Sequence, residues 1–435
     1  MHRLITLLGW AIAGAVSLHA DPHWPQWRGA SGQGVSTDAS LPTQWSPAER
    51  IAWKIPVPGR AHSSPIVWGD RVFLTTALEG DPIPGHAPLK HSIGGKEWRH
   101  PEATAGDRRH TFQVMAVNAA DGQVLWTRTA YEGPVYDDRH RKSSYAAHTP
   151  ATDGTRVYAY FGSEGLYAYR FDGTLAWSAM LGKLGGMSVG TGTSVVLFEN
   201  LVLIQADEDN GEASFLAALD KTTGKEAWRV RRSGVSVSWA TPIVAGTGDR
   251  AQLITAANEH TIAYDPRTGR ELWRERGLNN NAIPSPVLAG DLVIVSAGYP
   301  QKKTLAFRLR PVDGQPRLAW EYTKGTAYVT SPIVYGNYLY LSTDGGILTC
   351  LDARTGAVLY EGGRPPVPAT FMALPVAFGG HLYTTSEDGR TFVIKAGPAH
   401  DVVRTNSIGE PVFASPALAH GTIYIRGERH LFAIR

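Results

Sequence analysis

The sequence is poor in cysteine, in charge and in long helical patterns, and each shortage excludes a class of protein. Its single cysteine, Cys350, cannot form an internal disulfide, so packing and strand pairing alone must hold the fold. We interpret Cys350 as a small buried apolar residue. Charged residues make up 19% of the chain, and the formal net charge of +3 is too small to indicate binding to nucleic acid or an anionic membrane. No long stretch shows the three-to-four spacing of an amphipathic helix.

Catalytic motifs are also missing from the sequence. It contains no Gly-x-Ser-x-Gly elbow, no His-Glu-x-x-His helix and no phosphate-binding loop. Carboxylates and histidines occur in the polar segments, but the sequence alone does not place them within reach of one another. We therefore assign no catalytic residue and no metal ligand from the sequence.

The first residues have the pattern of an export signal. Arg3 is followed by an apolar run over residues 4–18, which has the length of a signal-peptide core and is too short to span a bilayer comfortably. We expect cleavage after Ala20, although Leu18 is larger than a signal peptidase prefers at that position. A retained membrane anchor is the alternative. A lipid anchor is not expected, because no cysteine lies near the cleavage point. The predicted location is therefore periplasmic or secreted, with no integral membrane segment after cleavage.

The abundant residues indicate many short strands joined by tight turns, since the chain holds 47 Gly, 28 Pro and 13 Trp. One element recurs eight times: a step that is usually Ser/Thr-Pro, followed by two apolar runs around a tight turn. The copies lie at 63–76, 148–162, 192–206, 240–256, 284–297, 330–343, 373–386 and 414–427.

A second recurring element is a strand, a Gly-containing turn and a strand that ends in Trp, as in "ALDKTTGKEAW" (218–228). The turn glycine tolerates the positive φ that a short hairpin requires. Four short antiparallel strands per unit, repeated eight times, predict an all-β fold, an eight-bladed β-propeller over residues 49–435. The recurring tryptophans are expected to pack between blades, where stacking buries the sheet faces. They are Trp126, Trp177, Trp228, Trp273 and Trp320.

The last repeat is incomplete, because residues 414–435 supply three strands and no fourth. A spare strand at 49–59 precedes the first repeat and carries Trp53 where the other copies carry their Trp. We predict that this strand completes the eighth blade and closes the ring, which also hides two strand edges. Residues 21–48 remain as an N-terminal extension.

Strand order places the tight turns on one face of the ring and the long polar connections on the other. The longest connections span 77–111 and 131–148. Loops held by a rigid ring commonly carry binding residues, so we expect a site on this face at the mouth of the central channel. Such residues could bind an anionic or carbonyl-bearing ligand, or they could simply be hydrated. The candidate ligand-binding residues are His62, Arg139, His140, Lys142, Tyr145, His148, Trp239 and Asn281.

Two other polar groups are interpreted as surface features. The run "DEDNGE" (207–212) lacks the spacing of a twelve-residue calcium loop and is expected to be a solvated acidic turn. His86, His91, His100 and His110 are irregularly spaced, unlike most zinc ligands, and are expected on the surface.

The pattern in "ALDKTTGKEAW" resembles the tryptophan-docking repeat of the pyrroloquinoline-quinone (PQQ)-type propellers, and the resemblance covers nearly all of the chain after residue 20. The opening "WPQWRGASGQGVS" (24–36) resembles exported PQQ-like propeller proteins. The family contains quinoprotein dehydrogenases, in which PQQ and calcium are bound over the channel, commonly beside a ring formed by two adjacent cysteines. It also contains noncatalytic scaffolds of similar length, typified by the outer-membrane assembly lipoprotein BamB. A single cysteine cannot form the ring, and the N-terminal cysteine of the lipoprotein is absent here.

These observations favour an exported, monomeric and noncatalytic binding or scaffold propeller that recognises a protein or a carbohydrate-derived ligand through its long-loop face. No cofactor is expected on this hypothesis, and nucleic acid is not a predicted partner. The alternative is a reduced quinoprotein oxidoreductase that uses PQQ with calcium to oxidise alcohols or sugars. A third hypothesis, a hydrolase or lyase acting on sugars, requires a cluster of acidic or histidine side chains in the channel.

Overall fold

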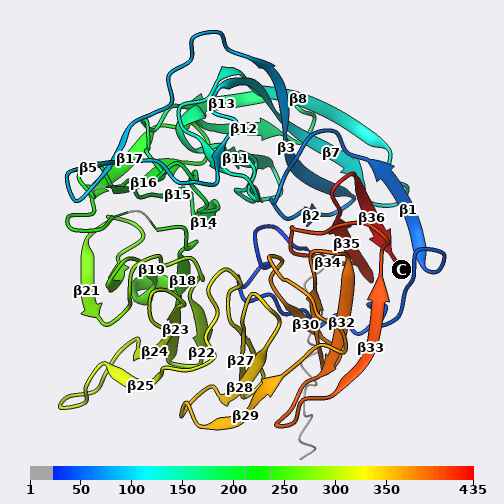
Figure 1. The fold of residues 1–435 in the computed structure, drawn as a ribbon, viewed down its shortest axis with the longest axis vertical. Coiled ribbons are helices and arrows are strands. Elements are labelled where there is room, and N and C mark those ends of the chain that lie inside the picture. The colour runs from blue at the N-terminus through cyan, green and yellow to red at the C-terminus, as the bar shows by residue number, and fades with distance from the viewer. Residues whose placement is uncertain (1–22, 210, 237) are drawn as a thin grey trace, which may run out of the picture.

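The computed structural model describes residues 23–209, 211–236 and 238–435, and the predicted signal peptide lies outside them. Eight four-stranded antiparallel sheets are arranged as blades around a central channel (Figure 1), as the sequence predicts. Within the described ranges no helix is long and apolar enough to cross a membrane. The described residues also form two short 3-10 helices, η1 (Gly162–Glu164) and η2 (Gly248–Arg250).

The first four blades follow one another along the chain, each built from the channel outward. Their strands are β2 (Ile66–Trp68), β3 (Arg71–Pro82), β7 (Arg108–Asn118) and β8 (Val124–Pro134); β10 (Ala151–Thr152), β11 (Arg156–Tyr160), β12 (Leu166–Arg170) and β13 (Leu175–Ala179); β14 (Val196–Phe198), β15 (Leu201–Ala206), β16 (Phe215–Asp220) and β17 (Glu226–Arg231); and β18 (Ile243–Ala245), β19 (Gln252–Ala256), β20 (His260–Tyr264) and β21 (Glu271–Arg276).

The last four blades repeat this order, and only the eighth takes its outer strand from the N-terminal part of the chain. Their strands are β22 (Val287–Ala289), β23 (Leu292–Ala297), β24 (Lys303–Arg308) and β25 (Leu318–Tyr322); β26 (Ile333–Tyr335), β27 (Tyr338–Ser342), β28 (Leu348–Asp352) and β29 (Val358–Gly363); β30 (Val376–Phe378), β31 (His381–Thr385), β32 (Arg390–Lys395) and β33 (Val402–Ser407); and β34 (Ala417–Ala419), β35 (Thr422–Arg426), β36 (His430–Ile434) and β1 (Ile51–Pro56).

The ring is closed by strand pairing between the two ends of the described chain. Strand β1 lies antiparallel to β36, with Trp53 opposite Ala433 and Ile55 opposite Leu431. Figure 1 shows β1 beside β36 and the C-terminus at the outer edge of this blade. The prediction that an N-terminal strand completes the last blade is therefore confirmed.

Most of the recurring tryptophans pack on a turn glycine of the next blade. A methyl group added to Gly122, which has a φ of +81°, would lie 2.9 Å from the Trp53 ring. Trp126 covers Gly173 in the same way. The Trp53 indole N–H also donates to the Ala119 carbonyl, 3.1 Å away, which fixes the ring over the turn. The other pairs of this kind are Trp177 with Gly224, Trp228 with Gly269 and Trp320 with Gly356. The strand tryptophan and the turn glycine recur together because they form one contact between neighbouring blades.

The Ser/Thr-Pro step forms a belt of hydrogen bonds around the channel. The backbone N–H of Ser64 in the first blade donates to Oγ1 of Thr149 in the second, and the N–H of Thr149 donates to Oγ of Ser194 in the third. In six of the eight blades, the hydroxyl of this step thus accepts an N–H from the preceding blade. Leu374, which has no hydroxyl, interrupts the belt in the seventh blade. The four remaining bonds, 2.8–2.9 Å long, join Ser194 to Thr241, Thr241 to Ser285, Ser285 to Ser331 and Leu374 to Ser415.

The N-terminal extension crosses the channel at its tight-turn end. Trp24 forms a bridge with Val67 in the first blade, and Val35 forms one with Ala377 in the seventh. Between them, the buried Arg28 donates to the Pro332 carbonyl of the sixth blade at 2.7 Å. This segment, residues 23–36, lies in the middle of the ring in Figure 1, and we call it the plug.

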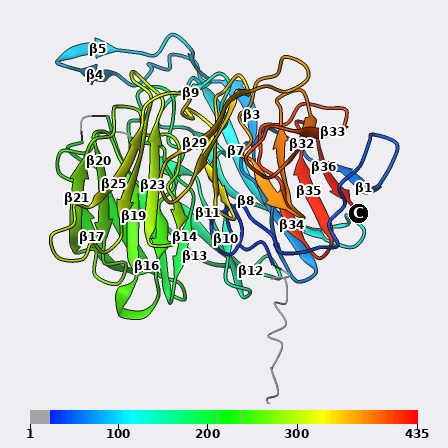
Figure 2. The same ribbon diagram turned by 90° about the horizontal axis from the view of Figure 1, so that it is seen from below.

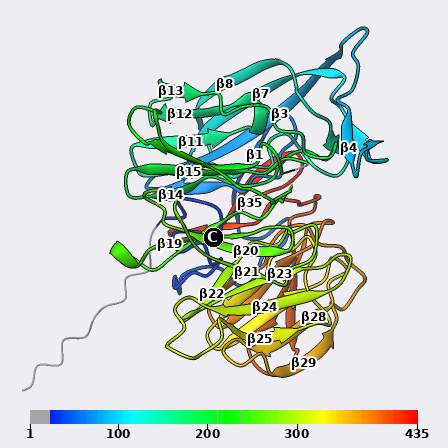
Figure 3. The same cartoon turned by 90° about the vertical axis from the view of Figure 1, so that its left-hand side faces the viewer.

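The long connections lie at the opposite end of the channel. Within the 83–107 connection, β4 (His91–Ile93) pairs with β5 (Lys96–Trp98), and this hairpin projects beyond the ring in Figures 2 and 3. The same connection is tied to the next one by pairing of β6 (Ala103–Thr104) with β9 (Arg139–His140).

Candidate functional site

A cavity of about 640 Å³ occupies the long-loop end of the central channel. All eight blades contribute to its wall, and Trp27 of the plug lies at its inner end. Trp27 also lines a second cavity on the tight-turn side, so this indole stands between the two spaces. The described structure therefore presents a cup that opens toward the long loops.

The structure brings five of the eight candidate residues together in the wall of this cup. They come from four separate blade connections, and each lies just before a repeat or within the 131–148 connection. These residues are His62, His140, Lys142, Trp239 and Asn281.

The other three candidates do not line this cavity, and their part in ligand binding stays a prediction. The guanidinium of Arg139 is already bound by other groups of the protein. It pairs with Glu79 at 3.2 Å and donates to three backbone carbonyls of its own loop. The Tyr145 hydroxyl donates to the Asp137 carbonyl at 2.9 Å. Burial lowers the pKa of His148 to about 4, and its Nε2 is 3.0 Å from the Thr191 hydroxyl. All three hold loops in place.

The histidines of the wall are poor cations at neutral pH. Burial, together with the nearby Arg60 and Arg426, lowers the pKa of His62 to about 3, and its ring stacks on Phe413. Burial also lowers the pKa values of His100 and His140. Of the described residues that line the cavity, Lys142 alone carries a permanent positive charge.

Two carboxylates in the wall, Asp344 and Glu387, were missed by the sequence analysis. Burial and the neighbouring Glu387 raise the pKa of Asp344. The backbone N–H of Val329, which donates to Oδ1 of Asp344 at 3.0 Å, lowers this pKa but does not outweigh them. Glu387 forms an ion pair with Lys142 at 3.5 Å. Each acid stands two residues after the second strand of its blade, in the short segments "STDGG" (342–346) and "TSEDG" (385–389). That shared position is the signal that could have identified them.

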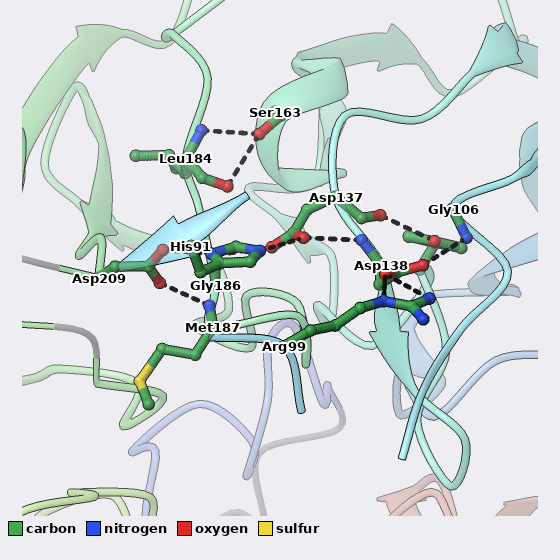
Figure 4. A network of polar contacts seen from close by, with 11 residues as sticks. His91, Arg99, Gly106, Asp137, Asp138, Ser163, Leu184, Gly186, Met187 and Asp209 are labelled. Carbon is green, nitrogen blue, oxygen red and sulfur yellow. Dashed lines mark hydrogen bonds and ion pairs between the residues drawn. The ribbon is translucent and has the colours of Figure 1, made fainter. Parts of the chain in front are cut away.

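The expectation that His91 and His110 lie on the surface is wrong. His91 is 3% exposed, and its two ring nitrogens contact Asp137, at 2.8 Å, and Asp209 (Figure 4). Burial lowers the pKa of His91, but the hydrogen bonds to both carboxylates outweigh burial and raise it to about 10. His110 is 2% exposed and contacts the Ala105 carbonyl through Nε2 at 2.8 Å.

The prediction of a solvated turn at 207–212 is wrong for Asp207 and Asp209, whose side chains are buried, whereas Glu212 is exposed. Asp207 is fully buried and forms a 2.8 Å ion pair with Arg232, which is also buried. Asp209 accepts the backbone N–H of Met187, a cavity-lining residue, as well as contacting His91. Asp137 accepts the N–H of Gly186 at 2.7 Å. His91 and its two carboxylates therefore join the projecting hairpin to the segment that forms one side of the cup.

The side chains of the cup do not fit PQQ with calcium. PQQ is a tricarboxylate, and its binding requires several cationic groups, whereas the one lysine of the wall is already paired with Glu387. Within residues 23–209, 211–236 and 238–435, no group of three or more His, Cys, Asp or Glu side chains is placed to hold a metal ion. Cys350 is buried in β28. The cup therefore offers little positive charge to the carboxylates of the quinone.

Comparison with known proteins agrees with this architecture. The chain is 25% identical to outer membrane protein assembly factor BamB of Shewanella oneidensis over 294 residues, which cover 65% of this chain and 66% of that protein. It is 28% identical to the BamB of Nitrosomonas eutropha over 181 residues, 39% of each chain. The matched segments thus span just under two thirds and about two fifths of these relatives.

Solved structures show the same fold at low sequence identity. BamB from Moraxella catarrhalis superposes with a TM-score of 0.56 and 12% identity, covering 83% of this chain and 98% of that one. Quinohemoprotein alcohol dehydrogenase from Comamonas testosteroni superposes with a TM-score of 0.60 and 12% identity, covering 95% and 80%. A family model described as outer membrane protein assembly factor BamB matches residues 110–362. With more than half of its length matched, the chain belongs to this BamB family of PQQ-like β-propellers.

Proposed function

We propose that this protein is an exported, noncatalytic binding propeller that receives a ligand, or a projecting segment of a protein partner, in its channel cup. The observation that carries the proposal is the plug. Because residues 23–36 cross the tight-turn end of the channel, the cup has its open side toward the long loops. Concave sites with apolar walls and a few converging polar groups are the usual form of a ligand site.

The relatives point to a role in recognition. The curated proteins that match this chain are named as assembly factors, and assembly depends on binding other molecules. The mismatch between the cup and PQQ with calcium makes the quinoprotein alternative the weaker one. We extend to this chain the expectations of a periplasmic or secreted location, a monomeric ring and a protein or carbohydrate-derived ligand.

The proposal can be tested by blocking the cup chemically. Cys350 is buried, so a cysteine introduced at the exposed cavity residue Thr370 can be labelled selectively with a bulky maleimide. Thr222, in an exposed turn at the other end of the channel, provides the matched control for labelling. Peptides and saccharides are screened for ligands that raise the melting temperature. We expect them to stabilise the unlabelled Thr370→Cys variant and both forms of Thr222→Cys, but not labelled Thr370→Cys. Equal stabilisation of all four forms would contradict the proposal.

The pair of carboxylates supports a second candidate function, hydrolysis of a glycosidic bond. Asp344, with its raised pKa, is suited to donate a proton to the leaving oxygen, and Glu387, which pairs with Lys142 at 3.5 Å, is suited to take a proton from the attacking water. The C–O bond breaks as water adds, with no oxidant required. Release of reducing ends from a saccharide, abolished by Glu387→Gln, would establish this activity; binding without release would exclude it for that saccharide.

A further inference from the structure

We propose that the cup recognises a neutral, hydroxyl-rich ligand, of which a saccharide is the representative class. This inference rests on the proposed function, because it names the ligand of the same cavity. Three features of the wall carry it: fixed aromatic faces, a belt of hydroxyl groups, and acidic side chains that are not matched by free cations.

The aromatic side chains of the wall are held in place before any ligand arrives. The Trp239 indole N–H donates to the Gly190 carbonyl at 2.7 Å, which fixes the ring and leaves its apolar faces for contact. Phe413 is stacked against His62, with ring centroids 4.9 Å apart. Tyr328 and Phe371 line the same space. Rigid aromatic rings offer large apolar contact area at low entropic cost, and they suit the C–H faces of a sugar ring.

The hydroxyl belt supplies polar contacts around the inner part of the cup. Each belt oxygen accepts one backbone N–H from the neighbouring blade, so the hydroxyl keeps its proton and a second lone pair. Such groups can both donate to and accept from the hydroxyl groups of a ligand. The belt residues that line the cavity are Thr149, Ser194, Thr241, Ser285, Ser331 and Ser415.

The charges of the wall disfavour an anionic ligand. Two carboxylates, Asp344 and Glu387, face one ammonium group, Lys142, which is bound to Glu387. His62, His100 and His140 are largely neutral at pH 7, because their pKa values are lowered. The side chains that line the cavity therefore offer no net positive charge to a phosphate, a nucleotide or a polycarboxylate. Carboxylates are instead good acceptors for neighbouring hydroxyl groups of a sugar.

Binding is measured on the purified full chain by calorimetry, with maltotriose, cellotriose and chitotriose as neutral probes. Trigalacturonate serves as the anionic probe and spermidine as the cationic one. The cavity variants are Trp239→Ala and the isosteric Asp344→Asn. Their matched controls are Trp98→Ala, on the projecting hairpin, and Asp313→Asn, in an exposed turn. The Asn variant keeps an oxygen for the Val329 N–H, so it tests the site even if Trp239→Ala fails to fold.

We expect at least one neutral trisaccharide to bind more tightly than both charged probes, and each cavity variant to weaken it by about tenfold or more while the controls leave it unchanged. Cleavage of the trisaccharide would uphold the ligand class and overturn the noncatalytic function. Tighter binding of trigalacturonate or spermidine would overturn the inference that the ligand is a neutral saccharide. Tighter binding of a peptide, prevented by the label at position 370, would do the same. Both results would leave the proposed binding function standing. Failure of every probe and every screened peptide to bind in the cup would overturn both.

Discussion

The backbone N–H of Ser285 donates to Oγ of Ser331 at 2.9 Å, across a separation of 46 residues and the boundary between two blades. Ser285 in turn accepts the N–H of Thr241 at 2.8 Å. One hydroxyl thus joins its blade to the preceding one, and the same contact recurs around the channel. The belt adds directional bonds between blades whose other contacts are mostly apolar.

Removing one belt hydroxyl should destabilise the ring measurably. Ser285→Ala leaves the buried N–H of Thr241 without its acceptor, at a cost of about 1–3 kcal/mol in the free energy of unfolding. Ser285→Thr keeps the hydroxyl and should lose much less, since Thr occupies the equivalent position in two other blades. Urea unfolding followed by tryptophan fluorescence measures both variants. Equal losses for Ala and Thr would show that the hydroxyl is unimportant.

The contact between Trp53 and Gly122 can be tested from the glycine side. Gly122→Ala forces a side chain onto a residue with a φ of +81° and brings its Cβ to 2.9 Å from the Trp53 ring. Gly69→Ala is the matched control, because Gly69 has a φ of +57° and open space around the added carbon. We expect both variants to lose about 1–2 kcal/mol in the free energy of unfolding because of backbone strain. Gly122→Ala should lose more, because its added carbon also meets the Trp53 ring. Identical melting temperatures for the two variants would argue against the contact.

Trp53 should contribute more to the free energy of unfolding than the half-buried Trp320 does. Trp53 is 8% exposed, and its indole N–H donates to the Ala119 carbonyl, whereas the buried Nε1 of Trp320 has no hydrogen-bond partner among the described residues. Trp53→Ala is expected to cost about 3–5 kcal/mol, and Trp320→Ala less. Calorimetric melting compares the two. A larger loss for Trp320→Ala would mean that closure of the eighth blade does not depend on Trp53.

The contribution of His91 to stability should fall as the pH rises. Its folded-state pKa is about 10, above the ordinary value of 6.5, so the stabilisation is complete below about pH 6.5 and is lost as the pH passes through about 10. We expect the difference in melting temperature between the wild type and His91→Gln to shrink between pH 6 and 10. His86→Gln, in the same loop, is the matched control substitution. A difference that is constant with pH would contradict an imidazolium between Asp137 and Asp209.

The repeats made the fold predictable, because each blade is specified by short patterns that recur in the sequence. Trp53 and the spare strand around it could be assigned to the last blade by their likeness to the other copies. The candidate site was only partly predictable. Trp239 and Asn281 were found because they precede a repeat. Asp344 and Glu387 were missed because they lie in short turns, whereas binding residues were expected in the long loops.

The buried polar network was not predictable, because its partners are distant in sequence. His91 and Asp209 are 118 residues apart and meet only when the hairpin of the first blade folds over the third. Nothing in the spacing of histidines or acidic residues indicates such a contact. Local sequence therefore suggested solvent exposure for groups that the tertiary structure buries.

The strand pairing between β1 and β36 also sets the order in which the molecule can be completed. Residues 51–56 emerge from the ribosome long before residues 430–434, yet each strand needs the other as its neighbour. Strand β1 must therefore wait, without a neighbouring strand, until residues 430–434 have been made. Closure of this ring therefore depends on contacts between residues that are far apart in the sequence, which makes it slow and leaves the unclosed ring open to aggregation.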